Sequence, residues 1–542
     1  MGSTLGPAGA LPPADAGTAA EPAPAAEPAP SGRRRNTSLV LRGGSWNLLG
    51  QLTPIVVGIA LTPFVVHSLG MQRYGVFALA TSITTFLASF DGGIRPSAQR
   101  YLARYAGQRD TARTTRLVVT LSLLAGALGA ALLAVLWFAA PLLLAAFSTP
   151  LPLRGDAVFL LRTLAGTAAL GLLQGLFTAL LNARHRYGLT NATRIGVQLL
   201  YAAGVLFSLH HGYGLRGIAL TLLGQAALSA LVLVPAAARY LDRAELGLMP
   251  RAELREFLGY SWRVQLTSIA GLVNLQADTL IVGAVTPIAQ VGLYSVGANF
   301  AAQLRSVPVN ALSPMQTTLG QVHGEEGPER AQAEFTRLQR LWVLLTTGWL
   351  SVGAAASCFG LTAWLGTGYR LSAVVAAVLL VGHMVNVWTG VLTLWLGTVG
   401  RPEVEARYGI VGMVLNVVLT AALAVPFGVV GVVVATAVAQ VLGSLYLLRV
   451  VRTRVGAVPS FLREVPVVPA LAGVAVTVGV ELLVRGISPS GAAGLLVSGL
   501  AAAPGLAVYA ALAAGTSGLR RVLPARFRPA RSLPGRRATT PA

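Results

Sequence analysis

Residues 63–103 decide the fold and read PFVVHSLGMQRYGVFALATSITTFLASFDGGIRPSAQRYLA. An apolar run ends at Val66, a short polar hairpin follows, and a second apolar run extends to Asp91. This second run has about 18 residues, which is enough to cross a bilayer. The stretch therefore predicts a transmembrane helical hairpin whose second helix ends in an acid, followed by the basic residues Arg95, Arg100 and Arg104.

The acid at the end of this hairpin has two interpretations. A charge close to lipid is costly unless it pairs or faces water. Asp91 is therefore predicted either to pair with Arg95 at the membrane surface or to take part in transport as a coupling residue.

The composition of the whole chain is also that of a membrane protein. Of its 542 residues, 54% are hydrophobic and 11% are charged, whereas soluble domains carry about 25% charged residues. All 41 basic residues are arginines, and they lie in short loops between apolar runs, which argues against nucleic-acid binding despite the net charge of +22. The single Cys358 excludes a disulfide within the chain and a Cys-rich metal site. No cofactor is predicted.

Hydropathy and loop breaks predict fourteen spans. Their approximate limits are 45–66, 76–94, 116–140, 156–181, 193–209, 214–238, 260–285, 290–312, 341–365, 371–396, 407–426, 428–449, 466–485 and 491–514. With the N-terminus inside, 35 arginines fall on the cytoplasmic side and six outside, as the positive-inside rule asks. The six outer arginines are Arg73, Arg154, Arg162, Arg216, Arg370 and Arg485. Both termini are therefore predicted to be cytoplasmic.

An internal repeat organises these spans. Trp46 corresponds to Trp262, residues 74–77 to 291–294, and residues 212–219 to 426–433, all about 215 positions apart. Six spans lie between equivalent positions, so the two halves have the same orientation, an arrangement found in secondary transporters. The predicted fold is all-α: a polytopic membrane protein of about 14 transmembrane helices, with two six-helix lobes in parallel repeat and two extra C-terminal helices.

The domain limits follow from this repeat. The segments are a disordered, basic-ended cytoplasmic tail (1–42), an N-terminal lobe (43–240), a C-terminal lobe (241–455), the extra helices 13 and 14 (456–518) and a basic cytoplasmic tail (519–542). The first 32 residues are rich in Ala, Pro, Gly and Glu, a composition that cannot bury enough apolar surface to fold.

Several spans carry a polar stripe at helical spacing. The stripes contain Asn47 and Gln51 in span one, Asn274 and Asp278 in span seven, Asn299 and Gln303 in span eight, and His383 in span ten. Such residues either pack helices together through close approach and hydrogen bonds or line a water-filled cavity between the lobes. An acid as deep as Asp278 must pair, take up a proton or face water. Asp278 and His383 therefore join Asp91 as coupling candidates, whereas Glu481 is expected to pair with Arg485 four residues on.

The pattern of Gly, Pro, Tyr-Gly and Asp-Gly positions in residues 63–103 resembles the opening hairpin of the bacterial oligosaccharide flippases. These form the Wzx-type branch of the multidrug/oligosaccharidyl-lipid/polysaccharide exporter superfamily. The resemblance implies a flippase in the bacterial cytoplasmic membrane that serves cell-surface polysaccharide biosynthesis by alternating access. Its substrate would be a polyprenyl-diphosphate-linked oligosaccharide moving from the inner to the outer leaflet, with polysaccharide polymerase and glycosyltransferases as partners.

The same resemblance implies cationic partners for the diphosphate, and arginine suits phosphate recognition. The candidates at the inner mouth are Arg42, Arg95, Arg100 and Arg263, and the alternative for each is a plain topology anchor. Two alternatives from the same superfamily are a lipid II flippase and a cation-coupled multidrug exporter. An alternative from another class is a membrane-embedded polysaccharide polymerase or ligase. Such enzymes usually carry a large outer loop, and this chain has none beyond roughly 20 residues.

Overall fold

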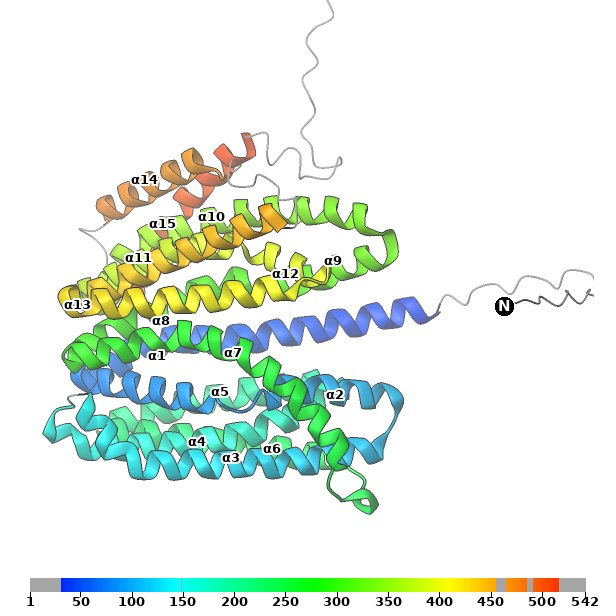
Figure 1. Ribbon diagram of the computed structural model, residues 1–542. Helices are drawn as coiled ribbons and strands as arrows, with labels where there is room; N and C mark the ends of the chain where they lie inside the picture. The colour runs from blue at the N-terminus through cyan, green and yellow to red at the C-terminus, as the bar shows by residue number, and fades with distance from the viewer. Residues whose placement is uncertain (1–30, 148, 455–464, 485–490, 516–542) are drawn as a thin grey trace, which may run out of the picture. The chain divides into compact units, whose positions relative to one another are not determined.

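The computed structural model describes residues 31–147, 149–454, 465–484 and 491–515 (Figure 1). The chain divides into two units, residues 1–45 and 46–542, and the second unit carries the features below. Within the described ranges every regular element is a helix.

The helices follow one another with short connections. Their bounds are α1 Ser31–Ala88, α2 Ile94–Gln108, α3 Thr111–Ala146, α4 Leu151–Ala183, α5 Tyr187–His210, α6 Gly214–Ala238, η1 Arg243–Glu245, α7 Arg251–Val285, α8 Ile288–Val309, α9 Leu312–Glu326, α10 Pro328–Leu365, η2 Thr367–Tyr369, α11 Arg370–Trp388, α12 Gly390–Thr398, α13 Pro402–Arg454, α14 Val467–Val484 and α15 Ala492–Gly515.

Ten stretches of the described chain are helical, long and apolar enough to cross a membrane. Two of them contain a break, because Gly70 in α1 and Gly428 in α13 have non-helical backbone angles. Each of these two broken stretches therefore holds two of the predicted spans. The helices α7 and α8 correspond to the two remaining predicted spans, which are more polar. The predicted class, an all-α polytopic membrane protein of about fourteen helices, is confirmed.

The polar end of the opening hairpin forms a turn and a separate helix. Gly92 and Gly93 both have positive φ, near 70°, and Oδ1 of Asp91 accepts a hydrogen bond from the Gly93 amide at 2.9 Å. The second span therefore ends at Ala88 rather than at residue 94, and α2 begins at Ile94. No sequence signal predicted this short helix.

The helices pack in two groups with a third pair beside them. In the first half, α4 packs against α2, α3 and α6, and α5 packs against α6. In the second half, α11 packs against α8, α10 and α13, and α7 packs against α13. The helices α14 and α15 pack on each other and on α10 (Figure 1). Nothing tests the residue limits of the lobes, which stay a prediction.

The repeat reappears as symmetric contacts. A Cβ atom on Gly75 would collide with the carbonyl oxygen of Ile288, and one on Gly292 would lie 2.7 Å from the carbonyl oxygen of Met71. Gly75 and Gly292 are equivalent in the repeat, and so are Met71 and Ile288. The two halves thus meet at α1 and α8 about a local two-fold axis, which is the geometry that a parallel repeat predicts.

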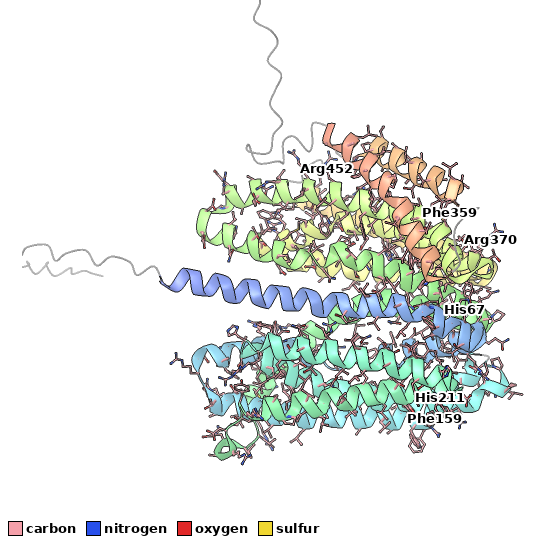
Figure 2. The ribbon with its side chains drawn as sticks, turned by 180° about the vertical axis from the view of Figure 1, so that it is seen from behind. His67, Phe159, His211, Phe359, Arg370 and Arg452 are labelled. Atoms are coloured by element: carbon pink, nitrogen blue, oxygen red, sulfur yellow. The ribbon has the colours of Figure 1, made fainter. Side chains whose placement is uncertain are left out.

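Loops predicted to be external gather at one end of the bundle. His67, His211 and Arg370, which come from three different connections, all lie at that end (Figure 2). The rings of His67 and Tyr369 are 6.0 Å apart there.

Candidate functional site

A polar cavity of about 760 Å³ lies between α1, α7, α8, α11 and α13. It is called the central cavity below. Tyr74, Thr81 and Ser82 of α1 line it from the first half of the chain, and the other helices come from the second half. Both halves of the repeat therefore contribute polar side chains to one space, an arrangement that fits the cavity interpretation of the polar stripes.

Asp278 is the most enclosed charged group of the central cavity. The residue is 4% exposed. Oδ2 accepts hydrogen bonds from Thr436 at 2.7 Å and Tyr294 at 3.3 Å, and Oδ1 accepts from Asn416 at 3.1 Å and Thr420 at 3.5 Å. All four donors are neutral. Within the described chain Asp278 forms no ion pair, so the interpretation as a structural ion pair does not describe this arrangement.

Arg305 brings a positive charge into the same cavity. One of its terminal nitrogens donates to Oδ1 of Asn386 at 3.1 Å, and Asn386 donates onward to the Tyr408 hydroxyl at 2.6 Å. Nε of Arg305 is buried and has no hydrogen-bond partner. Among the described residues no carboxylate lies within the 4.0 Å of an ion pair with Arg305. A half-buried cation whose Nε donor is unused is suited to an anionic ligand.

His383 completes the polar wall on α11. Its Nδ1 is 2.7 Å from Oε1 of Gln440, so the ring donates to the amide oxygen when Nδ1 carries the proton. His383, Asn386 and Arg305 all line the central cavity. These residues of α8 and α11 add hydrogen-bonding groups to the lining of the cavity.

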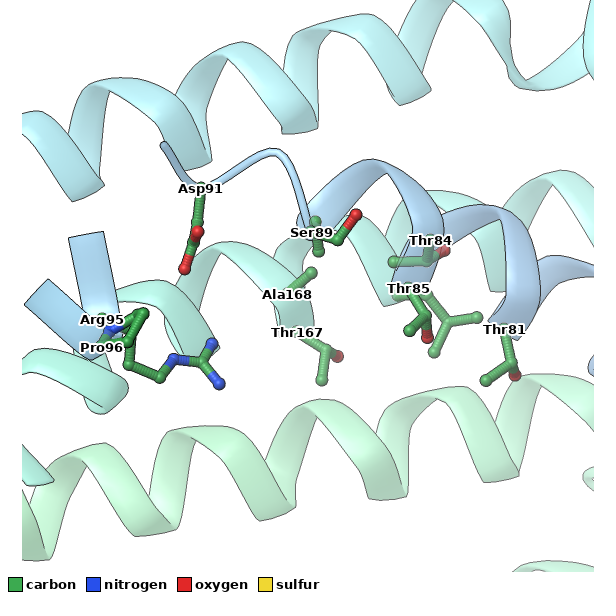
Figure 3. Close-up of a pocket in the computed structure, with 11 residues that line it drawn as sticks. Thr81, Thr84, Thr85, Ser89, Asp91, Arg95, Pro96, Thr167 and Ala168 are labelled. Atoms are coloured by element: carbon green, nitrogen blue, oxygen red, sulfur yellow. The ribbon is translucent and has the colours of Figure 1, made fainter. Parts of the chain in front are cut away.

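A second space of about 470 Å³ lies between α1, α2 and α4 (Figure 3). We call it the hydroxyl pocket, after its five hydroxyl side chains Thr81, Thr84, Thr85, Ser89 and Thr167. Asp91 and Arg95 also line it, and neither forms an ion pair with any residue that the structure describes. Thr81 lines the central cavity as well, so the two spaces adjoin.

A third space of about 460 Å³, the α2–α7 cleft, collects arginines from both halves of the chain. They are Arg100, Arg104, Arg255 and Arg263. The Arg100 guanidinium lies 4.4 Å above the Tyr260 ring, and the Tyr101 hydroxyl donates to Glu256 at 3.3 Å. Burial, followed by the nearby Glu256 carboxylate, raises the pKa of Tyr101. The cleft is basic and exposed.

The predicted site residues thus fall into separate places. Asp278, Asn299 and His383 share the central cavity, Asp91 and Arg95 the hydroxyl pocket, and Arg100 and Arg263 the α2–α7 cleft. Gln303 does not line the central cavity, and its amide lies near Gly58 of α1. The side chains of Asn47, Gln51 and Asn274 lie outside those that the structure describes.

Sequence reasoning missed Arg305, because it counted that residue among the cytoplasmic topology signals. Arg305 lies seven residues after Ala298, so both line the cavity from one face of α8, but an apolar Ala298 gives no sign of a cavity in the sequence. Glu481 accepts a hydrogen bond from Ser498. Its predicted pairing with Arg485 stays a prediction, because Arg485 lies outside the described residues.

The bundle, its repeat and its cavity define a multi-pass membrane protein with the fold of transporters and flippases. A family model described as "Polysaccharide biosynthesis protein" matches residues 40–319, just over half of the chain, and the chain belongs to this family. The resemblance to the exporter superfamily is confirmed. No curated protein matches in sequence.

Solved structures share the fold. A lipid II flippase MurJ in an inward closed conformation superposes with a TM-score of 0.69 at 11% identity, covering 88% of this chain and 99% of that chain. An inward-facing multidrug resistance MATE family transporter superposes with a TM-score of 0.63 at 14% identity, covering 76% and 98%. At this identity the likeness concerns the fold alone.

Proposed function

We propose that this protein flips a polyprenyl-diphosphate-linked oligosaccharide from the inner to the outer leaflet of the bacterial cytoplasmic membrane. The observation that carries the proposal is Arg305, a half-buried arginine whose buried Nε has no hydrogen-bond partner, in a cavity shared by both halves. A diphosphate is the part of such a substrate that needs a buried cation. The family description, polysaccharide biosynthesis, supports the oligosaccharide as the cargo.

The path of the substrate follows from the placement of the cations. The exposed arginines of the α2–α7 cleft would attract the diphosphate at the inner mouth, and Arg305 would receive it inside. The polyprenyl tail would stay in lipid. Alternating access would then expose the cavity to the other leaflet as the two halves rock about the Gly75–Gly292 contact.

Asp278 is the coupling candidate that the geometry favours. Its carboxylate is held by groups from α8 and from both parts of α13, on either side of the break at Gly428. A change of its charge, through a proton or a bound cation, would alter the hydrogen bonds that join these helices. The carboxylate therefore links a charge-dependent step to helix movement in the second half.

The alternatives make different demands on the cavity. A lipid II flippase also handles a diphosphate, so Arg305 fits both substrates and only the glycan separates them. An exporter of cationic drugs would be opposed by the charge of Arg305. A polymerase or ligase needs an acid and a base placed around a reacting bond, whereas the Asp278 carboxylate is occupied by four donors.

Replacement of Arg305 by Gln tests the proposal. Gln keeps hydrogen-bonding capacity without the charge, and a lost charge-assisted hydrogen bond costs about 1.5–3 kcal/mol. We expect display of the surface polysaccharide to fall by about tenfold or more, with the protein still present in the membrane. The matched control is Arg452→Gln, an exposed arginine at the end of α13 (Figure 2). Normal display with Arg305→Gln would remove this residue, and the diphosphate path through it, from the mechanism.

A further inference from the structure

The hydroxyl pocket has a chemistry that differs from that of the central cavity. The Thr81, Thr84 and Thr167 hydroxyls donate to carbonyl oxygens of their own helices, at 2.7, 2.8 and 3.0 Å. Ser89 likewise donates to the Phe86 carbonyl. Since each hydroxyl has one donor and two lone pairs, these four side chains present acceptors to any ligand.

The two charged residues add one further acceptor group and one donor group. Oδ1 of Asp91 holds the Gly93 amide at 2.9 Å, which leaves Oδ2 for a ligand. The Arg95 side chain lies against Gly175 of α4. A Cβ atom added to Gly175 would lie 2.6 Å from Nε of Arg95. Its guanidinium therefore extends into the pocket beside Asp91 (Figure 3).

This combination selects a neutral ligand with many hydroxyl groups. A cation would be repelled by Arg95, and an anion would meet the Asp91 carboxylate and the hydroxyl lone pairs. A sugar donates through its hydroxyls and accepts through the same oxygens, so it satisfies both kinds of group at once. The volume, about 470 Å³, lies in the range of about 300–1,000 Å³ that small-molecule sites have.

We propose that the hydroxyl pocket binds the glycan of the substrate, while Arg305 in the adjoining cavity binds the diphosphate. The inference rests on the proposed function and adds a separate sugar subsite in the first half of the chain. Thr81, which lines both spaces, marks the junction between the sugar and the diphosphate. Polar groups at membrane depth are costly, and such groups commonly line substrate paths.

Two cysteine reporters test this division of the substrate. Cys358 is the single cysteine, so Cys358→Ser gives a background for Ala168→Cys in the hydroxyl pocket and Ala298→Cys in the central cavity. Both replace an alanine and keep every polar group. Labelling by N-ethylmaleimide is followed with lipid-linked oligosaccharides extracted from the source membranes, and with undecaprenyl diphosphate, which has no sugar.

We expect the oligosaccharide lipid to slow labelling of both reporters by about tenfold, and undecaprenyl diphosphate to slow only Ala298→Cys. Protection of Ala168→Cys by undecaprenyl diphosphate would assign the pocket to phosphate and overturn the proposal. If the oligosaccharide lipid protects Ala298→Cys but not Ala168→Cys, the proposal of a sugar subsite is wrong, and the proposed function is still supported. Absence of protection at both reporters would overturn both.

Replacement of hydroxyl side chains in the hydroxyl pocket is a second, independent test of the sugar subsite. In the Ala168→Cys protein, Thr85→Val and Thr167→Val together keep the side-chain volume and remove two hydroxyls from the pocket. We expect about tenfold weaker protection by the oligosaccharide lipid, with protection of Ala298→Cys by undecaprenyl diphosphate unchanged. The control is Thr163→Val, one turn earlier on α4 and outside the pocket lining. Unchanged protection of Ala168→Cys in the double valine variant would contradict a sugar subsite.

Discussion

At the scale of single residues, Asp278 joins three helices through one carboxylate. Asp278→Asn has nearly the same shape but lacks the charge and one acceptor. We expect flipping to fall by about tenfold or more. The free energy of unfolding should fall by about 1–3 kcal/mol, and the melting temperature should fall by the corresponding amount. Thr436→Val, which removes one donor at 2.7 Å from the carboxylate, should cost about 1 kcal/mol.

Thermal unfolding and transport measurements on these two variants separate a role of Asp278 in coupling from a role in stability. If Asp278→Asn transports as the unmodified protein does, the charge has no part in coupling. If the Asn variant disappears from the membrane, the four hydrogen bonds serve structure instead.

Polar stripes in the sequence predicted Asp278, Asn299 and His383, because an uncharged or acidic polar residue at helical spacing is conspicuous in an apolar span. They did not predict the partners of Asp278. Asn416 and Thr436 follow it by 138 and 158 residues, and such contacts depend on how the helices pack. Arg305 was missed for another reason: near the end of a span, an arginine in a cavity and a topology signal look the same in sequence.

At the scale of helices, the crossing of α1 and α8 depends on two glycines. A methyl group at Gly75 would meet backbone, the Ile288 carbonyl, which has little freedom to move aside. We expect Gly75→Ala to cost about 1–3 kcal/mol and to lower the melting temperature of the purified protein. Gly126 in α3 has no atom within 4 Å of the built Cβ. Gly126→Ala should therefore leave the temperature unchanged or raise it, since Ala favours helix by about 1 kcal/mol.

Equal melting temperatures for the two alanine variants would show that the α1–α8 crossing is looser than these contacts imply. The repeat at this crossing could be predicted from the sequence, because Gly75 and Gly292 occupy matching positions. The break inside α1 at Gly70 falls in the predicted hairpin between the first two spans, whereas the short helix α2 was not predicted. The apolar pattern predicted a hairpin and a span running to residue 94, whereas positive-φ glycines end α1 earlier.

At the scale of the whole transporter, the α2–α7 contact must open and close if access alternates. Tyr101→Cys with Glu256→Cys, in the Cys358→Ser background, places two thiols across this contact. We expect a short, cleavable bifunctional thiol reagent to stop flipping, and cleavage of the linker to restore it. The matched control is Arg116→Cys with Glu245→Cys, an ion pair at 2.6 Å between α3 and η1. Continued flipping in the linked Tyr101–Glu256 pair would exclude movement at this contact.

The central claim is that the cavity carries a diphosphate-linked oligosaccharide across the membrane by way of Arg305. Its most direct test is leaflet transfer in vesicles that contain the purified protein and one labelled lipid. An enzyme added outside the vesicles removes the glycan only from the outer leaflet, so the kinetics report flipping. We predict transfer of the polyprenyl-diphosphate oligosaccharide, reduced about tenfold or more by Arg305→Gln and unaffected by Arg452→Gln. Transfer of lipid II alone, or equal transfer by the Arg305→Gln protein, would contradict the account.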